Sequence, residues 1–203
     1  MTDKIFLQES TATVAYADMR RFSIISAQLG PVDVSVALRR YYEHIEESVL
    51  HHGGRIVKFM SDGVLVLFPS VSGRDHAGNG LGMLSRLAET VGPWLEENEA
   101  KGLPVMEYSV GVATGRVLHG EVGTARQRAF DLLGLPVVLA MQLAHLATVR
   151  TTPHLITGPC IQSAGGQVPS IEVEGAELAG ERIRLYRLLA PRETQATGDP
   201  QAI

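Results

Sequence analysis

Residues 55–68 read RIVKFMSDGVLVLF, and this stretch decides the fold that we predict for the chain. Two apolar runs, RIVKFM and VLVLF, flank Ser61, Asp62 and Gly63. Asp-Gly is a preferred pair for a type I′ hairpin turn, because glycine accepts a positive φ angle. The stretch therefore predicts a β-hairpin that carries Asp62 at its tip.

A strand and a helix are predicted on the N-terminal side of this hairpin. Residues 12–17, ATVAYA, form an apolar run that ends on Asp18, which indicates a buried strand with a carboxylate at its end. From Pro31 to Leu50 apolar residues recur every three or four positions, which predicts a helix. Proline suits the first turn of that helix, and Gly53-Gly54 suits its end.

The C-terminal side alternates helices with further strands. We predict helices over 75–100 and 134–149, a second hairpin that turns at Thr114-Gly115, and strands over 154–157 and 171–187. Short connections between these elements predict an α+β sandwich of the ferredoxin-like type, with an antiparallel or mixed sheet covered by helices on one face. We expect one domain over 1–189 and a disordered polar tail over 190–203.

Composition excludes several classes of protein. The 203 residues carry 18 Lys and Arg against 22 Asp and Glu, a net charge of −4, which gives no support to binding a nucleic acid through bulk charge. The single cysteine, Cys160, excludes an intrachain disulfide and a cysteine-based metal cluster. No window reaches the ~18 apolar residues of a membrane span. We therefore expect a cytoplasmic protein without a membrane segment.

Asp18 and Asp62 are the candidate metal ligands. If their strands are neighbours, the two carboxylates converge on one point, as a Mg²⁺ pair requires, and the phosphates of a substrate complete the shell. The alternative is that Asp62 serves only the turn and Asp18 only caps the segment that follows it. Spacing alone favours this second interpretation.

Four blocks in order resemble the catalytic domain of class III adenylate and guanylate cyclases. They are VAYADMRRFS, HHGGRIVKFMSDGVLVLF, YSVGVATGRVLHGEVG and FDLLGLPVVLAMQL. The match as a whole runs in order from about residue 11 to residue 189. The resemblance implies the class III cyclase fold and a head-to-tail dimer with its active sites between the subunits. It also implies a two-metal reaction, with Mg²⁺ or Mn²⁺, that converts a nucleoside triphosphate to a 3′,5′-cyclic nucleotide and pyrophosphate.

The resemblance also assigns the metal and phosphate positions. Asp18 and Asp62 match the two catalytic, metal-binding aspartates, and Met19 is assigned to the metal site with them. The segment 19–23 matches the turn whose backbone amides, with Phe22 and Ser23, hold the triphosphate.

The resemblance assigns a ligand-binding role to each of two basic residues, and for each a purely structural role remains as the alternative. Lys58 matches the lysine that reads the purine from the opposite subunit, but it also shares a strand face with Asp62 and could be a structural partner for that acid. Arg116 matches an arginine that some members direct at the phosphates, and the alternative is a solvated arginine at a strand end.

Other positions depart from the family. The base-reading acid corresponds to Leu135, the transition-state asparagine to Val138, the transition-state arginine to Gln142, and a lysine near the C-terminus to Ala179. Leucine and valine offer no polar group, and glutamine lacks the charge that stabilises developing phosphate charge.

The sequence thus predicts a cyclase domain that keeps the metal half of its site and has lost transition-state groups. One interpretation is an adenylate or guanylate cyclase subunit for intracellular signalling, as a homodimer or as a heterodimer with a partner chain that supplies the missing groups. The other is a catalytically silent module that binds nucleotide and metal or only dimerises. A third is homodimer catalysis on an unusual base.

Overall fold

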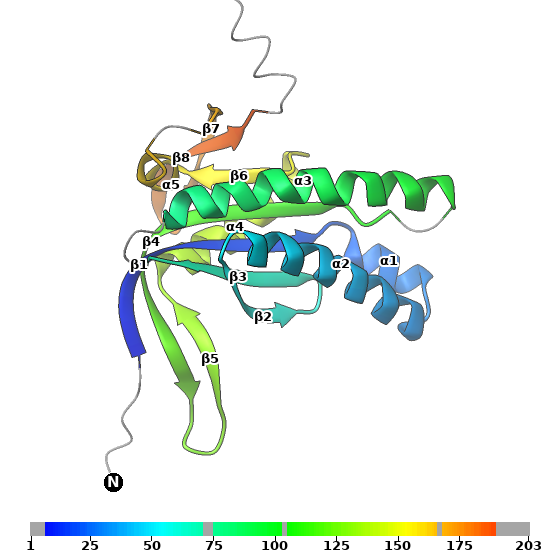
Figure 1. The fold of residues 1–203 in the computed structure, drawn as a ribbon, viewed down its shortest axis with the longest axis horizontal. Helices are drawn as coiled ribbons and strands as arrows, with labels where there is room; N and C mark the ends of the chain where they lie inside the picture. Colours follow the sequence, from blue (N-terminus) through cyan, green and yellow to red (C-terminus); the bar gives the residue numbers. More distant parts are fainter. Residues whose placement is uncertain (1–6, 71–74, 103–104, 166–167, 190–203) are drawn as a thin grey trace, which may run out of the picture.

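One mixed sheet of eight strands carries the fold, and helices pack on both of its faces (Figure 1). The computed structural model describes residues 7–70, 75–102, 105–165 and 168–189, so the predicted tail over 190–203 lies outside the described residues. The strands are β1 (Leu7–Met19), β2 (Arg55–Met60), β3 (Gly63–Pro69), β4 (Tyr108–Gly123), β5 (Arg128–Leu133), β6 (His154–Thr157), β7 (Ser170–Leu178) and β8 (Glu181–Leu188). The helices are α1 (Phe22–Gln28), α2 (Pro31–His51), α3 (His76–Ala100), α4 (Leu135–Val149) and α5 (Gly158–Ser163).

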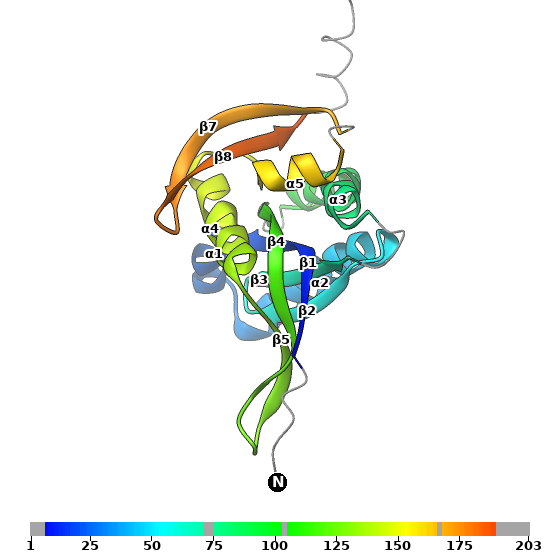
Figure 2. The same cartoon turned by 90° about the vertical axis from the view of Figure 1, so that its left-hand side faces the viewer.

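The strands run in the order β2-β3-β1-β4-β6-β8-β7, and β5 pairs with β4. Only the β4–β6 pairing is parallel among the described ladders. β1 and β4 are the central pair, and their register joins Asp18 to Ser109. Figures 1 and 2 show the β4–β5 hairpin and the first part of β1 projecting away from the body of the molecule. The predicted mixed α+β sheet is confirmed.

The prediction that helices cover one face is wrong. Alternate residues of β1 enter two different cores: Ala15 and Ala17 pack with α2 and α3, while Val14 and Tyr16 pack with α4. Figure 2 shows α4 on one side of β1 and β4, with α2 and α3 on the other. Because α4 is apolar over most of its length, the sequence did not reveal which face of the sheet it covers.

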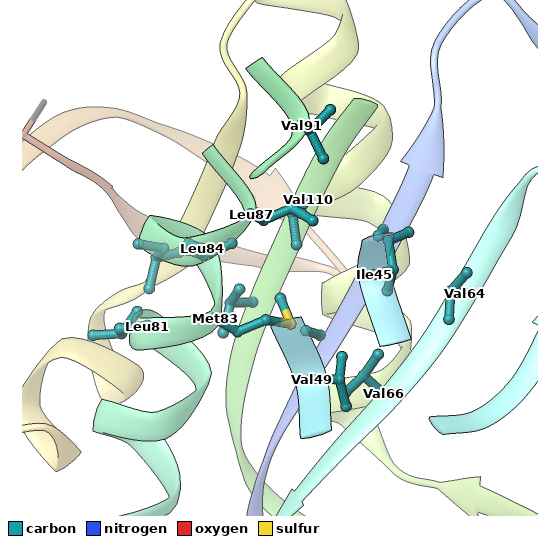
Figure 3. Close-up of a cluster of buried hydrophobic side chains, with 14 of the residues drawn as sticks. Ile45, Val49, Val64, Val66, Leu81, Met83, Leu84, Leu87, Val91 and Val110 are labelled. Atoms are coloured by element: carbon teal, nitrogen blue, oxygen red, sulfur yellow. The ribbon is translucent and has the colours of Figure 1, made fainter. Parts of the chain in front are cut away.

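The larger core lies between the sheet and the pair α2 and α3. Figure 3 shows Ile45 and Val49 of α2 beside Val64 and Val66 of β3, close to the buried residues of α3. Val49, Val64 and Val66 are fully buried. Burying a side chain of this size stabilises the fold by about 1.5–3 kcal/mol relative to exposure, so this core fixes the end of β3 from which Asp62 projects.

The β2–β3 hairpin is confirmed, but its turn differs from the prediction. Met60 pairs with Gly63, so the turn residues are Ser61 and Asp62, and the left-handed backbone is at Ser61 with φ 54°. Gly63 is a strand residue for another reason: a Cβ there would overlap the hydroxyl group of Tyr16. The glycine therefore admits a side chain from β1.

Two other predicted boundaries are wrong. β4 runs straight through Thr114-Gly115, because both residues pair with β1, and the real turn lies between β4 and β5. A Cβ on Gly115 would approach Pro136 Cγ to 2.9 Å, so this glycine permits the close approach of α4. The predicted strand over 171–187 is two strands, β7 and β8, joined at Ala179 and Gly180, which have φ 50° and φ 82°.

Candidate active site

Asp18 and Asp62 lie where the neighbouring strands β1 and β3 meet at the same end of the sheet. Asp18 pairs with Gly63 across β1 and β3, and the amide of Met19 donates to the carbonyl oxygen of Asp62 at 2.9 Å. This arrangement places the two acidic residues side by side in the same chain, at the ends of the neighbouring strands β1 and β3. Burial, followed by the negative charge of Asp62, raises the pKa of the Asp18 carboxyl group to about 6, while His145 acts in the opposite direction.

Tyr16 is a member of this cluster that the sequence analysis missed. It lies two residues before Asp18 and therefore on the same face of β1, the face that α4 covers. Its hydroxyl group lies against Gly63, and burial together with the charges of Asp18 and Asp62 raises its pKa to about 12. The phenol therefore stays protonated beside the two carboxylates. An aromatic residue two positions before a strand-end aspartate was the available signal.

Tyr42 holds the turn that carries Asp62. Its hydroxyl group donates to the carbonyl oxygen of Ser61, and its ring packs on Phe59 with centroids 4.4 Å apart. Burial and the charge of Asp62 raise the pKa of Tyr42. A side chain of α2 thus fixes the strained backbone of Ser61, which precedes the acid.

The pair suits a divalent ion whose coordination a substrate completes. Mg²⁺ is commonly bound by one or two carboxylates together with substrate phosphates. Neither Asp18 nor Asp62 forms a salt bridge with a described residue, and the described residues contain no group of three His, Cys, Asp or Glu side chains that could hold a metal alone. The donor set fits the predicted Mg²⁺ or Mn²⁺, with the oxygens of a triphosphate as the remaining ligands.

The turn over 19–23 connects this pair to the rest of the sheet. The backbone amide of Arg20 donates to Glu107, and its guanidinium donates to Ser109 Oγ at 2.5 Å and to the carbonyl oxygen of Thr152. Arg21 has the left-handed backbone with φ 59°, and Phe22 and Ser23 open α1. The largely buried side chain of Arg20 therefore holds the turn against β4 and against the loop before β6.

Lys58 forms an ion pair, and its partner is Asp131 of β5. Nζ lies 2.5 Å from Oδ2, and both side chains are partly exposed. The structural partner of Lys58 is therefore Asp131, and the alternative that Lys58 pairs with Asp62 is wrong. Asp131 was missed because the sequence analysis placed the base-reading acid at Leu135, whereas the structure puts an acid beside Lys58 from a strand that we had not predicted.

The positions assigned to lost functions are on the surface. Leu135 and Val138 are 51% and 46% exposed, and Gln142 is exposed as well, all on α4. Ala179 lies at the tip of the β7–β8 hairpin. No packing demand therefore explains why these four positions carry apolar or uncharged residues.

Arg116 lies away from the carboxylates of its own chain. It pairs with Thr11, seven positions along β1 from Asp18, which is about 23 Å at 3.3 Å per residue. Its guanidinium forms an ion pair with Glu9. Within one chain the structure brings together Asp18, Asp62 and the 19–23 turn, and it leaves Arg116 outside that group.

The family described as "Adenylate and Guanylate cyclase catalytic domain" matches residues 7–151. The chain belongs to this family. That assignment covers both carboxylates, the 19–23 turn, Lys58 and Asp131, and it confirms the resemblance drawn from the four sequence blocks.

Individual cyclases are similar to it at low identity. Adenylate cyclase 1 of Rhizobium meliloti (strain 1021) is 25% identical over 150 residues, which is 73% of this chain and 23% of that protein. The chain spans about a quarter of the length of the curated relatives that match it first.

Solved cyclase structures share its fold. The guanylyl cyclase Cya2 superposes with a TM-score of 0.77 at 24% identity, covering 89% of this chain and 92% of that one. The adenylyl cyclase CyaB from P. aeruginosa gives 0.77 at 20% identity, with 92% and 98% covered. No helix among the described residues combines the length and the apolar character that a membrane crossing needs.

Proposed function

We propose that this cyclase-family chain is the metal-holding half of a nucleotide cyclase and needs complementary groups from a second chain. The observation that carries the proposal is the pair Asp18 and Asp62, held on adjacent strand ends and free of salt bridges with described residues. The reaction is the conversion of a nucleoside triphosphate to its 3′,5′-cyclic monophosphate and pyrophosphate.

Each part of the site has a task in this proposal. Two divalent ions would supply activation of the ribose 3′-hydroxyl group and neutralisation of charge on the phosphates. Asp18 and Asp62 hold the ions, and the amides of the 19–23 turn bind phosphate oxygens. Tyr42 orients the turn of Asp62, and Tyr16 keeps a protonated hydroxyl group beside both carboxylates.

The pair Lys58 and Asp131 is proposed to contact the base across a dimer interface. Lysine is a donor and the carboxylate is an acceptor, so the pair complements a base edge that presents an acceptor next to a donor. Adenine presents N7 as an acceptor beside the N6 amino donor, whereas guanine presents two acceptors, N7 and O6, on the same edge. This chemistry favours ATP over GTP as the substrate.

An exposed apolar stripe on α4 supports association with a second chain. Leu135, Val138 and Met141 lie along one side of the helix and are each at least one-third exposed. Exposed apolar patches of this kind are typical of protein interfaces. In a homodimer the metal sites would be present twice, and neither would receive an asparagine or an arginine from positions 138 and 142.

A catalytically silent module is the second candidate function. It is favoured by Val138 and Gln142, because the loss of one transition-state donor typically costs about 10²–10³ in rate. In that case Asp18 and Asp62 would still bind metal and nucleotide, and dimerisation would be the output.

A restored site separates these two functions. The purified chain is incubated with Mn²⁺ and each of the four common triphosphates, and cyclic product and pyrophosphate are measured. The double variant Val138→Asn with Gln142→Arg is assayed beside it. We expect the double variant to form cyclic product at least about 10²-fold faster than the unmodified chain, because it regains groups that act in the transition state.

Two controls make the assay specific. Adding Asp62→Ala to the double variant should abolish its turnover, and mixing that inactive triple variant with the unmodified chain should restore turnover, since one chain then supplies metals and the other the transition-state groups. If the double variant stays silent while Mn²⁺-dependent nucleotide binding persists, the silent module is correct. Binding that survives Asp18→Ala would place the site elsewhere.

A further inference from the structure

A cavity of about 650 Å³ lies on the α3 side of the sheet, away from the face that carries Asp18. It lies between the middle of α3, the start of β4, the loop before β6, the segment that leads into β7, and the end of β8. Much of its wall is apolar, with Leu84 and Ala88 from α3, Val168 and Pro169 from the segment before β7, and Leu188 and Leu189 from the end of β8. Cavities of this volume hold small organic molecules in proteins.

His154, Tyr108 and Arg187 bring hydrogen-bond donors to this wall, which also contains the hydroxyl groups of Ser85, Thr151 and Thr152. His154 Nε2 accepts from the amide of Leu188 at 2.9 Å, which leaves Nδ1–H as its donor. Burial and the charge of Arg187 lower the pKa of His154 to about 4, so the ring is neutral at pH 7. Tyr108 also lines the cavity, and burial raises the pKa of its hydroxyl group to about 12, so that the phenol stays protonated. Arg187 adds a guanidinium whose Nη1 also donates to the carbonyl oxygen of Leu188, and the acid Glu89 lines the cavity from the exposed side of α3.

We propose that this cavity binds a small amphipathic acid, an apolar body with one carboxylate, and that its occupancy tunes the phosphate-binding turn. An apolar wall accommodates the body, and the donors of Tyr108, His154 and Arg187 suit an anionic acceptor. Hydrogen bonds to a charged acceptor are about twice as strong as neutral ones. A neutral molecule of the same shape would lose that part of the interaction.

The wall of the cavity is continuous with the turn over 19–23. Tyr108 pairs with Met19 across β4 and β1. Thr152 and Pro153, from the loop before β6, also line the cavity, and the carbonyl oxygen of Thr152 accepts from the guanidinium of Arg20. A ligand that moves this loop or Tyr108 therefore moves a direct neighbour of the turn. The regulatory part of the proposal rests on the proposed function, and the binding part does not.

Binding is tested on the full chain with named probes. The fluorescent aryl sulfonate ANS is titrated into the folded protein and then displaced with decanoate or with decanol, both kept below their aggregation limits. We expect decanoate to displace the dye at least about tenfold more effectively than decanol, because only the acid forms charge-assisted hydrogen bonds. Equal displacement by both would overturn the assignment of an acid.

Variants locate the site. Ala88→Trp fills the cavity from an exposed position of α3 and should abolish decanoate binding, whereas Ala100→Trp, the same exchange at the exposed end of that helix, should leave it unchanged. Tyr108→Phe keeps the ring and should weaken decanoate about tenfold while leaving decanol unaffected. Decanoate that binds the Ala88→Trp protein with unchanged affinity would place its site elsewhere.

Coupling is tested by affinity, so it does not depend on turnover. The dissociation constant of Mn²⁺-ATP is measured with and without saturating decanoate, and that of decanoate with and without Mn²⁺-ATP. Linkage requires the two ratios to be equal, and we expect both to differ from one by about fivefold or more. Ratios of one would overturn the regulatory part. Decanoate binding without any nucleotide binding would refute the proposed function and leave the acid site standing.

Discussion

Asp18 experiences two unfavourable influences at once, burial and the charge of Asp62. Both disfavour its ionised form, which is why its pKa rises to about 6. A carboxylate kept in such surroundings costs folding stability and becomes useful when a cation neutralises it. In the metal-free chain the ionised Asp18 side chain is therefore electrostatically destabilising.

Replacing Asp18 by Asn should stabilise the metal-free protein above pH 6. Because the folded pKa lies above the ordinary value of 3.8, the favourable contribution of Asp18 is complete below about pH 4 and is lost as the pH rises through 6. The shift corresponds to about 3 kcal/mol, which solvent exposure reduces to roughly 1–2 kcal/mol. Urea unfolding at pH 7.5 should show this gain, and unfolding near pH 4 should not.

The same variant should lose metal-dependent stabilisation. Mn²⁺ with ATP should raise the melting temperature of the unmodified chain, less so below pH 6 where Asp18 is protonated, and should leave the Asp18→Asn protein unchanged. A variant that is less stable than the unmodified chain at pH 7.5 would contradict the electrostatic account of this residue.

Tyr42 is a positioning residue for Asp62 through Ser61. Tyr42→Phe keeps the ring on Phe59 and removes the hydrogen bond, so we expect a loss of about 1 kcal/mol in stability and several-fold weaker Mn²⁺-ATP binding. Calorimetric titration measures the affinity. Tyr186→Phe, which removes a hydrogen bond to Glu172 away from the site, is the matched control and should leave Mn²⁺-ATP affinity unchanged.

At the scale of elements, glycines of β4 set the distance between the sheet and α4. A Cβ on Gly111 would overlap the backbone of Ala140 and approach the amide nitrogen of Ala144 to 2.6 Å, and Gly115 similarly faces Pro136. The close approach keeps α4 in contact with the strand that pairs with β1. His145 of the same helix thereby comes close enough to influence Asp18.

Gly111→Ala should therefore push α4 away from the sheet. We expect it to destabilise the protein by about 1–3 kcal/mol, as overpacking of a tight contact does, and to weaken Mn²⁺-ATP binding. Gly92→Ala in α3 is the control, because nothing lies within 4 Å of its added methyl group. It should be neutral or stabilising by up to about 1 kcal/mol. Chemical unfolding of both variants decides the matter.

At the scale of the whole molecule, the exposed side of α4 carries an apolar stripe and the positions Val138 and Gln142. Leu135, Val138 and Met141 are exposed on α4, whereas Asp18 and Asp62 lie at the strand ends. A second chain that covers the α4 stripe would bury apolar surface and complete a shared site. Association is therefore the property on which catalysis would depend.

Met141→Glu should weaken this association without unfolding the chain. The charge falls within the exposed apolar stripe, so burial at an interface becomes unfavourable, while the position is 36% exposed in the single chain. Sedimentation velocity over a concentration series should show a shift toward the monomer, with an unchanged melting temperature. Leu50→Glu, at a 62% exposed position of α2, is the control and should not change the sedimentation. Equal behaviour of both variants would argue against the stripe as an interface.

The sequence by itself determined the three long helices, the β2–β3 hairpin and the two acids, but not α1, α5 or β5. The helices α2, α3 and α4 follow from apolar residues at helical spacing, and the β2–β3 hairpin follows from two apolar runs around Asp62, because local periodicity and turn chemistry are properties of neighbouring residues. The motif blocks also sufficed for the family. These are short-range signals, and a chain carries them before it folds.

Only the tertiary structure decided which distant side chains meet. Asp131 beside Lys58, Tyr42 on Ser61 and Tyr16 against Gly63 are contacts across strands and helices that are set by register and by the face on which each helix packs. A glycine such as Gly115 looks the same in sequence whether it turns the chain or admits a neighbour. Burial and close approach are collective properties of the packed molecule, so no single stretch of residues encodes them.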